Sequence, residues 1–132
     1  MNPAASPYVL IVEDDTQIGR LLSLLMTRQG YRIELETDGL AALERIGKAE
    51  AVPALVLLDL MLPRRDGYEI ASFLRTCPGW QQVPVIMLSA RNGQHDAARR
   101  EQAGIDEFIA KPFQPAELLQ RLQPYMKAAG SA

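Results

Sequence analysis

The sequence Tyr8-Val9-Leu10-Ile11-Val12-Glu13-Asp14-Asp15 joins five apolar residues to three acidic ones. An apolar run of this length predicts a buried strand. Similar short runs follow at residues 32–35, 54–58, 85–88 and 107–110. Between the runs lie segments with helical periodicity, and the first of them places five apolar residues on one face: Ile18, Leu21, Leu22, Leu25 and Met26. Strand and helix alternate five times, which predicts an α/β fold with a parallel sheet.

The expected helices have recognisable starts and stops. Asp38 can cap the second helix, and Pro115 suits the first position of the fifth. Gly30 and Gly104 supply C-terminal stops after the first and fourth helices. The fourth helix, at residues 94–103, has few apolar positions and is the weakest prediction. For the third helix, at 68–75, we expect three side chains to face the sheet: Ile70, Phe73 and Leu74.

Composition excludes several classes of protein. The chain has 132 residues, 48% hydrophobic and 23% charged, with a formal net charge of −2, which suits one globular domain. A single cysteine and a single histidine exclude a disulfide scaffold and a zinc site built from Cys and His. The mild acidity argues against nucleic acid as a direct partner, and no apolar run approaches the roughly 20 residues of a membrane span. We therefore expect one cytoplasmic domain, over residues 8–127, with flexible tails at 1–7 and 128–132.

Polar residues gather where the predicted strands end. Because ligands bind at the carboxyl ends of the strands in open parallel sheets, the residues there are candidates for a site. Glu13 and Asp14 follow the first strand, Asp59 the third, Ser89 the fourth and Lys111 the fifth. Each of these signals alone fits an ordinary turn, cap or surface residue. It is their agreement over four strands that predicts a site.

The charges at this edge indicate a cation. Glu13, Asp14, Asp59 and Lys111 sum to −2, and like charges about 4 Å apart cost about 4 kcal/mol per pair at an effective dielectric of about 20. Oxygen ligands without thiolate or imidazole favour Mg²⁺, which also leaves room for phosphate oxygens. A carboxylate beside Mg²⁺, a hydroxyl and a lysine is a candidate phosphoryl acceptor.

These motifs together resemble the receiver domain of two-component response regulators. The resemblance rests on five stretches in order: Val9–Asp15, Leu57–Pro63, Asp66-Gly67, Pro84–Ala90 and Gly104–Phe113. It covers roughly residues 8–127. It implies a doubly wound (βα)5 fold with the flavodoxin-like strand order 2-1-3-4-5.

The resemblance also implies a role for each site residue. Asp59 corresponds to the phospho-acceptor, and Lys111 to the lysine that binds the phosphoryl group and precedes a cis proline. Mg²⁺ would be held by four residues: Glu13, Asp14, Asp59 and, through its backbone carbonyl, Met61. Ser89 corresponds to the hydroxyl that engages the phosphoryl group, and Phe108 to the aromatic residue of the switch.

The implied mechanism is a phosphorelay. A sensor histidine kinase or a phosphotransfer protein presents phosphohistidine, and Asp59 accepts the phosphoryl group. Ser89 then moves toward it, and Phe108 moves into the space that Ser89 leaves. The changed surface of the fourth helix, fifth strand and fifth helix binds a downstream protein or output domain. The domain is thus expected to be a signalling switch that catalyses its own phosphorylation and dephosphorylation, not an enzyme with a separate substrate.

Two alternatives remain open at this point. A pseudo-receiver has the same fold without phosphorylation, although nothing in the sequence favours it. A phosphatase with an aspartate nucleophile needs a second aspartate two residues later, where this chain has Met61. A phosphorylation-dependent homodimer is a further partner to consider. Glu107, Glu117 and Arg121 match charged positions used for dimerisation in some receivers, but Ala97 and Ala116 interrupt that pattern.

Overall fold

A computed structural model describes residues 7–90 and 97–130 of the chain. Its centre is a parallel sheet in the order β2-β1-β3-β4-β5, as expected for the flavodoxin-like topology. The strand bounds are β1 Tyr8–Val12, β2 Arg32–Glu36, β3 Leu55–Asp59, β4 Val85–Ala90 and β5 Glu107–Lys111. Three of the strands therefore end on residues that the sequence placed just after them: Asp59, Ser89-Ala90 and Lys111.

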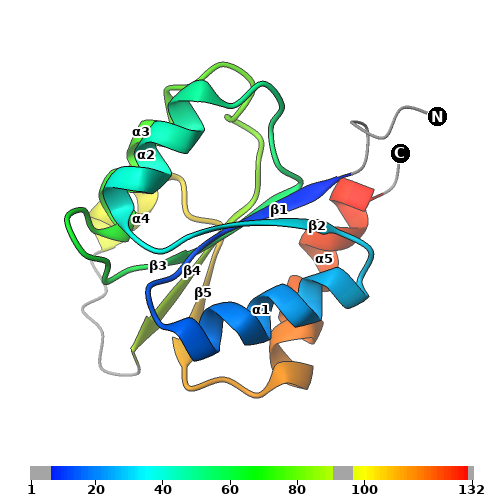
Figure 1. The fold of residues 1–132 in the computed structure, drawn as a ribbon. Helices are drawn as coiled ribbons and strands as arrows, with labels where there is room; N and C mark the ends of the chain where they lie inside the picture. The colour runs from blue at the N-terminus through cyan, green and yellow to red at the C-terminus, as the bar shows by residue number, and fades with distance from the viewer. Residues whose placement is uncertain (1–6, 91–96, 131–132) are drawn as a thin grey trace.

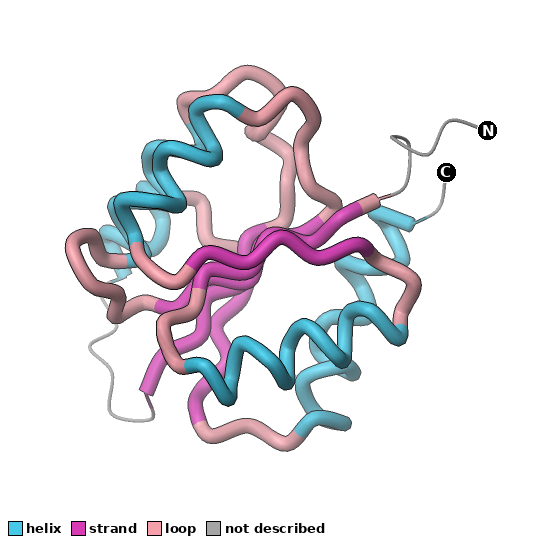
Figure 2. The backbone as a smooth tube through the Cα atoms, viewed as in Figure 1, coloured by secondary structure: helices cyan, strands magenta, loops and turns pink. Residues whose placement is uncertain are grey.

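Helices cover both faces of the sheet (Figure 1). On one face lie α1 (Thr16–Arg28) and α5 (Pro115–Gly130), and on the other lie α2 (Gly39–Lys48), α3 (Gly67–Arg75) and α4 (Ala97–Ala103). Figure 2 shows the same three layers, with the strands between the two groups of helices. The doubly wound (βα)5 arrangement predicted from the sequence is confirmed. No helix in residues 7–90 and 97–130 is long and apolar enough to cross a membrane.

Each face of the sheet has its own apolar core. Alternate residues of β1 enter different cores because successive strand side chains point to opposite faces. Leu10 and Val12 pack toward α2 and α3, whereas Val9 and Ile11 pack toward α1 and α5. All five residues of β1 and of β3 are buried, as a strand covered on both faces requires.

Aspartate caps fix the starts of three helices. Asp15 accepts a hydrogen bond from the backbone N–H of Ile18 at 3.1 Å, and Asp38 accepts one from Ala41 at 2.8 Å. Asp66 caps α3 in a capping box with Glu69. The predicted cap at Asp38 is confirmed, and positive φ angles of +96° at Gly30 and +68° at Gly104 fit their predicted roles as stops.

Two sequence predictions need correction. Phe73 was expected to face the sheet, but it is 37% exposed, because the buried face of α3 is centred on Ala71 between Ile70 and Leu74. The C-terminal tail was expected to begin at residue 128, but α5 continues to Gly130. Two alanines, the residues of highest helix propensity, extend the helix there. The rest of the predicted tails, at 1–6 and 131–132, and the first turn of the predicted fourth helix, at 94–96, lie outside the described residues.

Arg75 joins the end of α3 to the starts of β4 and β5. Its guanidinium donates hydrogen bonds to the carbonyl oxygens of Trp80 at 2.7 Å, Val83 at 2.8 Å and Gly104 at 2.6 Å. It also pairs with the carboxylate of Asp106 at 3.3 Å. The same carboxylate accepts a hydrogen bond from the backbone N–H of Val85 at 2.8 Å. One side chain thus satisfies three backbone carbonyl groups in two loops at the amino edge of the sheet.

Candidate functional site

Three carboxylates from two strand ends converge at the carboxyl edge of the sheet. Glu13 and Asp14 follow β1, and Asp59 is the last residue of the neighbouring strand β3. One oxygen atom from each of the three lies within 4.8 Å of the others. Glu13 and Asp59 are buried, whereas Asp14 is exposed. The cluster has oxygen ligands alone, which suits a hard divalent cation such as Mg²⁺.

Lys111 supplies the positive charge of this cluster. Its Nζ lies 2.8 Å from Glu13 Oε1 and 3.3 Å from Asp59 Oδ2, although it reaches them from β5, two strands away from β3. Burial alone would lower the pKa of Lys111, but the hydrogen bond to Glu13 and the charges of Asp59 and Glu13 outweigh burial and raise it. The lysine is therefore held as a cation. The peptide bond between Lys111 and Pro112 is cis, as the resemblance implied.

The electrostatic environment of Asp59 is unusual for an aspartate. The pKa of Asp59 is raised from 3.8 to about 7, mainly by burial and in addition by the negative charge of Glu13. The charge of Lys111 and a hydrogen bond from the backbone of Met61 act in the opposite direction. A pKa raised in this way is typical of a functional carboxylate rather than a surface one.

Backbone hydrogen bonds orient the carboxylates. The N–H of Asp15 donates to Glu13 Oε2 at 3.1 Å, and the N–H of Met61 donates to Asp59 Oδ1 at 3.3 Å. Glu13 itself is fixed by a hydrogen bond from its N–H to the carbonyl oxygen of Glu36 on β2, at 3.0 Å. The Met61 side chain is 69% exposed, so this residue contributes to the site through its backbone.

Ser89 and Phe108 lie on the neighbouring strands β4 and β5, Ser89 near the carboxyl edge of the sheet and Phe108 near the amino end of β5. Ser89, on β4, is 1% exposed, and its hydroxyl has no hydrogen-bond partner among the described residues. It pairs in register with Ala110 of β5, next to Lys111. Phe108 is half-buried, and its ring centroid lies 6.3 Å from that of Tyr68 on α3. The structure brings Glu13, Asp59 and Lys111 into contact but leaves the Ser89 hydroxyl unengaged.

A close backbone approach at Gly67 supports the Asp59 loop, and sequence reasoning did not assign it a role. A Cβ atom at Gly67 would lie 2.6 Å from the carbonyl oxygen of Asp59 and 3.0 Å from Leu60 Cα. The N–H of Gly67 donates to the carbonyl oxygen of Leu60 at 2.8 Å. Only glycine fits there. The Asp66-Gly67 pair after the strand was the available signal.

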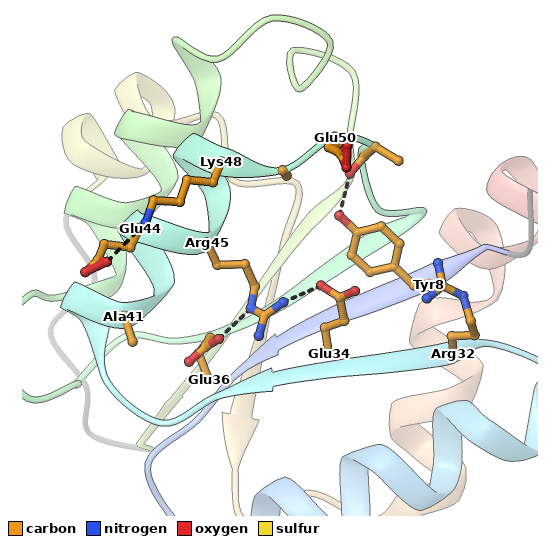
Figure 3. Close-up of a pocket in the computed structure, with 11 residues that line it drawn as sticks. Tyr8, Arg32, Glu34, Glu36, Ala41, Glu44, Arg45, Lys48 and Glu50 are labelled. Atoms are coloured by element: carbon orange, nitrogen blue, oxygen red, sulfur yellow. Dashed lines mark hydrogen bonds and ion pairs between the residues drawn. The ribbon is translucent and has the colours of Figure 1, made fainter. Parts of the chain in front are cut away.

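A separate groove lies between β2 and α2 (Figure 3). It has a volume of about 610 Å³, and its charged side chains largely pair with one another. The guanidinium of Arg45 lies between two carboxylates, those of Glu34 and Glu36, and Lys48 pairs with Glu44. The Tyr8 hydroxyl donates to the carbonyl oxygen of Ala51 at 2.6 Å. The charges that line this groove are therefore closer to balance than those of the carboxylate cluster.

Comparison with known proteins identifies the family. A family model described as the response regulator receiver domain matches residues 9–123. The chain belongs to this family. Its members are the signalling switches of two-component systems, in which a receiver accepts a phosphoryl group and interacts with histidine kinases and output domains.

Individual relatives agree with this assignment. The receiver is 41% identical over 115 residues to the uncharacterized transcriptional regulatory protein YbdJ of Bacillus subtilis, covering 87% of this chain and 48% of YbdJ. It is 31% identical to protein PilG of Pseudomonas aeruginosa, covering 89% of this chain and 86% of PilG. The chain spans about half the length of the first relatives it matches and most of PilG.

Solved structures share the fold of this receiver. One is the receiver domain of sensor histidine kinase PA1611 from Pseudomonas aeruginosa PAO1, with a magnesium ion coordinated in its active site cleft. It is 32% identical, with a TM-score of 0.78, and covers 96% of this chain and 100% of its own. Another is the chemotaxis protein CheY4 of Vibrio cholerae, 27% identical with a TM-score of 0.81, covering 92% of this chain and 99% of its own.

Proposed function

We propose that this receiver accepts a phosphoryl group on Asp59, in a Mg²⁺-dependent transfer from the phosphohistidine of a sensor histidine kinase or a phosphotransfer protein. The observation that carries the proposal is the position of Lys111 Nζ between Glu13 and Asp59. A buried carboxylate that faces a fixed cation, beside two further carboxylates able to hold a divalent cation, is suited to receive an anionic phosphoryl group. In the transfer, an Asp59 oxygen forms the bond to phosphorus while the bond from phosphorus to the histidine nitrogen breaks.

The metal would be held by Glu13, Asp14, Asp59 and the backbone carbonyl of Met61. The convergence of three carboxylates within 4.8 Å supports this assignment, as does the magnesium ion in the PA1611 receiver. Bound Mg²⁺ would neutralise charge on the transferred phosphoryl group and favour the ionised form of Asp59. Lys111 would neutralise charge on another phosphoryl oxygen. The net charge of Glu13, Asp14, Asp59 and Lys111 is −2, and a bound Mg²⁺ would bring it to zero before the phosphoryl group arrives.

The remaining assignments concern the switch. Ser89 is buried with an unpartnered hydroxyl, which makes it available to donate a hydrogen bond to a phosphoryl oxygen on Asp59. As Ser89 moves, Phe108 would turn inward from its half-buried position. The surface formed by α4, β5 and α5 would then change and bind a downstream protein, an output domain or a second receiver. In the structure, Arg121 of that surface pairs within the chain with Glu107 at 2.6 Å.

The proposal extends to the setting of this switch. The receiver would act in the cytoplasm beside its kinase, and it would catalyse its own phosphorylation and dephosphorylation without a separate substrate. The acceptor, the acidic pair and the lysine would all be needed for both reactions. The receiver domain would span residues 8–127, with α5 continuing to Gly130.

Phosphorylation by a small donor tests the proposal directly. With Mg²⁺ and acetyl phosphate, intact-protein mass spectrometry should detect the addition of one phosphoryl group to the wild-type chain. Asp59→Asn should abolish this addition. Asp38→Asn is the matched control, because it also removes one carboxylate and asparagine caps a helix as well as aspartate does. Equal labelling of Asp59→Asn and the wild type, or no labelling of the wild type, would contradict the proposal.

A further inference from the structure

Two consecutive arginines of α4 each stack on an aromatic ring. Arg99 Cζ lies 4.7 Å from the ring centroid of Tyr68, and Arg100 Cζ lies 4.6 Å from that of Phe108. The two rings are themselves neighbours, with centroids 6.3 Å apart and planes inclined by 53°. These four side chains form one contiguous cluster between α3, α4 and β5, which we call the arginine clamp.

Arg99 also ties α4 to the start of α3. Its guanidinium lies 3.1 Å from Asp66 Oδ2 and 3.3 Å from Oδ1. Asp66 is the N-cap of α3, so the arginine reaches a residue that is already fixed by its own hydrogen bond to Glu69. The two helices lie side by side on the same face of the sheet (Figure 1). Arg99 thus anchors the clamp to a rigid element.

Among the described residues, no hydrogen bond to its hydroxyl fixes the position of Tyr68. Tyr68 is 4% exposed, and its hydroxyl has no hydrogen-bond partner among the described residues. Its position is set by packing in the core and by Arg99. Because Phe108 packs beside this ring, the position of Phe108 is linked to α4 both directly, through Arg100, and indirectly, through Tyr68 and Arg99.

We propose that the arginine clamp is a built-in restraint on switching, which holds Phe108 in its half-buried position and so lowers the affinity of the domain for a phosphoryl group. This inference rests on the proposed function above. If Phe108 turns inward when Asp59 is phosphorylated, its ring leaves the guanidinium of Arg100. The contact is then present in one state and lost in the other, which is the condition for shifting a two-state equilibrium.

The size of the restraint follows from the strength of the contacts. A cation–π contact at an exposed site changes an equilibrium constant by about two- to fivefold. A ligand that needs the minor state binds more weakly by the fraction of molecules in that state. Removing Arg100 should therefore strengthen binding of a phosphoryl analogue by about two- to fivefold. Removing Arg99 as well should strengthen it further, since Arg99 positions the neighbouring ring.

Beryllofluoride binding is the appropriate measurement, because it mimics the phosphoryl group without turnover. The dissociation constant, measured by titration calorimetry in Mg²⁺, should fall in the order wild type, Arg100→Met, Arg99→Met/Arg100→Met. Arg100→Lys keeps a cation near the ring and should lie between the wild type and Arg100→Met. Arg20→Met is the control: Arg20 is an exposed arginine on α1, and its loss should leave the dissociation constant unchanged.

A second measurement reports on the clamp without any ligand. Hydrogen exchange of backbone amides in residues 98–103 should be faster in Arg99→Met/Arg100→Met than in the wild type, and unchanged in Arg20→Met. If the wild type fails to bind beryllofluoride, the proposed function is wrong and the restraint falls with it. If the wild type binds but Arg100→Met binds equally well or more weakly, the restraint is wrong and the proposed function stands.

Discussion

Lys111 Nζ lies closer to Glu13 Oε1, at 2.8 Å, than to Asp59 Oδ2, at 3.3 Å. In the unphosphorylated domain the lysine is thus mainly the partner of the buried acidic residue, and it is secondarily the partner of the proposed acceptor. A phosphoryl group on Asp59 would offer Lys111 a more highly charged partner nearby. In binding a phosphoryl group, Lys111 would therefore start from an ion pair with Glu13.

Replacing Lys111 by methionine tests this role. Phosphorylation by acetyl phosphate should fall by about 100-fold, because the variant lacks the fixed cation that stabilises charge on the transferred group. The initial rate of labelling, measured by mass spectrometry, reports the loss. Lys48→Met is the matched control, since Lys48 is an exposed lysine whose partner is Glu44 on its own helix. An unchanged rate in Lys111→Met would contradict the assignment.

The raised pKa of Asp59 predicts a pH-dependent stability. Between pH 3.8 and about 7 the folded chain keeps a proton on Asp59 that the unfolded chain loses, so the contribution of Asp59 to stability decreases as pH rises through this range. Asp59→Asn lacks this effect. In the absence of divalent cations, the variant should be more stable than the wild type by about 2 kcal/mol at pH 8, and this difference should shrink toward pH 5.

Urea denaturation at pH 5, 6, 7 and 8 provides the measurement. Asp38→Asn serves as the control for the loss of a carboxylate, and its difference from the wild type should not follow the same pH profile. Addition of Mg²⁺ should stabilise the wild type more at pH 8 than at pH 6, because the cation competes with the proton on Asp59. A stability gain for Asp59→Asn that is equal at pH 5 and pH 8 would contradict the raised pKa.

Gly67→Ala should destabilise the domain by about 2 kcal/mol, because the new Cβ would lie 2.6 Å from the backbone oxygen of Asp59 and must displace the acceptor loop. Gly47→Ala is the matched substitution within α2. There the new Cβ would lie 3.7 Å from Cζ of Phe73, which is an ordinary van der Waals distance. Alanine should therefore stabilise the helix by about 0.5–1 kcal/mol. Urea midpoints that move in the same direction for both variants would sink this interpretation.

Arg75→Met should cost about 3 kcal/mol of unfolding free energy. The substitution leaves the carbonyl oxygens of Val83 and Gly104 without their guanidinium donor, whereas that of Trp80 keeps a hydrogen bond from the N–H of Val83. Buried polar groups left unsatisfied each cost about 1–3 kcal/mol. Arg20→Met, at an exposed position, should change the stability by less than about 0.5 kcal/mol. Denaturation followed by far-UV circular dichroism distinguishes the two, and equal effects would argue against a structural role for Arg75.

Much of the fold was predictable because its signals are local. Apolar runs mark β1, β3, β4 and β5, and β2 is marked by the alternating Ile33 and Leu35. Asp38 and Gly30 mark helix ends by their own backbone preferences. The strand order and the roles of the site residues came from the resemblance, since periodicity alone does not order the strands of a sheet. The position of Phe73 was predicted wrongly because a spacing of three residues defines the buried face of a helix only approximately. The buried face of α3 includes the small Ala71, which leaves Phe73 at its margin.

The site was predictable as a set of residues but not as a geometry. Parallel strands bring Glu13, Asp59 and Lys111 to one edge, which the sequence indicates. That Lys111 reaches Glu13 across the neighbouring strands depends on sheet twist and side-chain packing. The contacts of Arg99 and Arg100 were equally invisible, because an arginine pair on a helix ordinarily faces solvent and nothing local marks the rings of Tyr68 and Phe108 as their partners.

The ion pair between Arg75 and Asp106, together with the hydrogen bonds between Asp106 and Val85, restrains how the domain can change shape. Asp106 N–H donates to the carbonyl oxygen of Val85, and its carboxylate accepts from the N–H of the same residue, so the first residues of β4 and the approach to β5 are locked together. Phe108 lies two residues beyond this lock. These hydrogen bonds restrain the backbone beneath it, so its ring would change environment chiefly by rotation about its side-chain torsions. If Asp59 accepts a phosphoryl group, the change would therefore reach Phe108 through side-chain rotamers more than through a shift of the sheet.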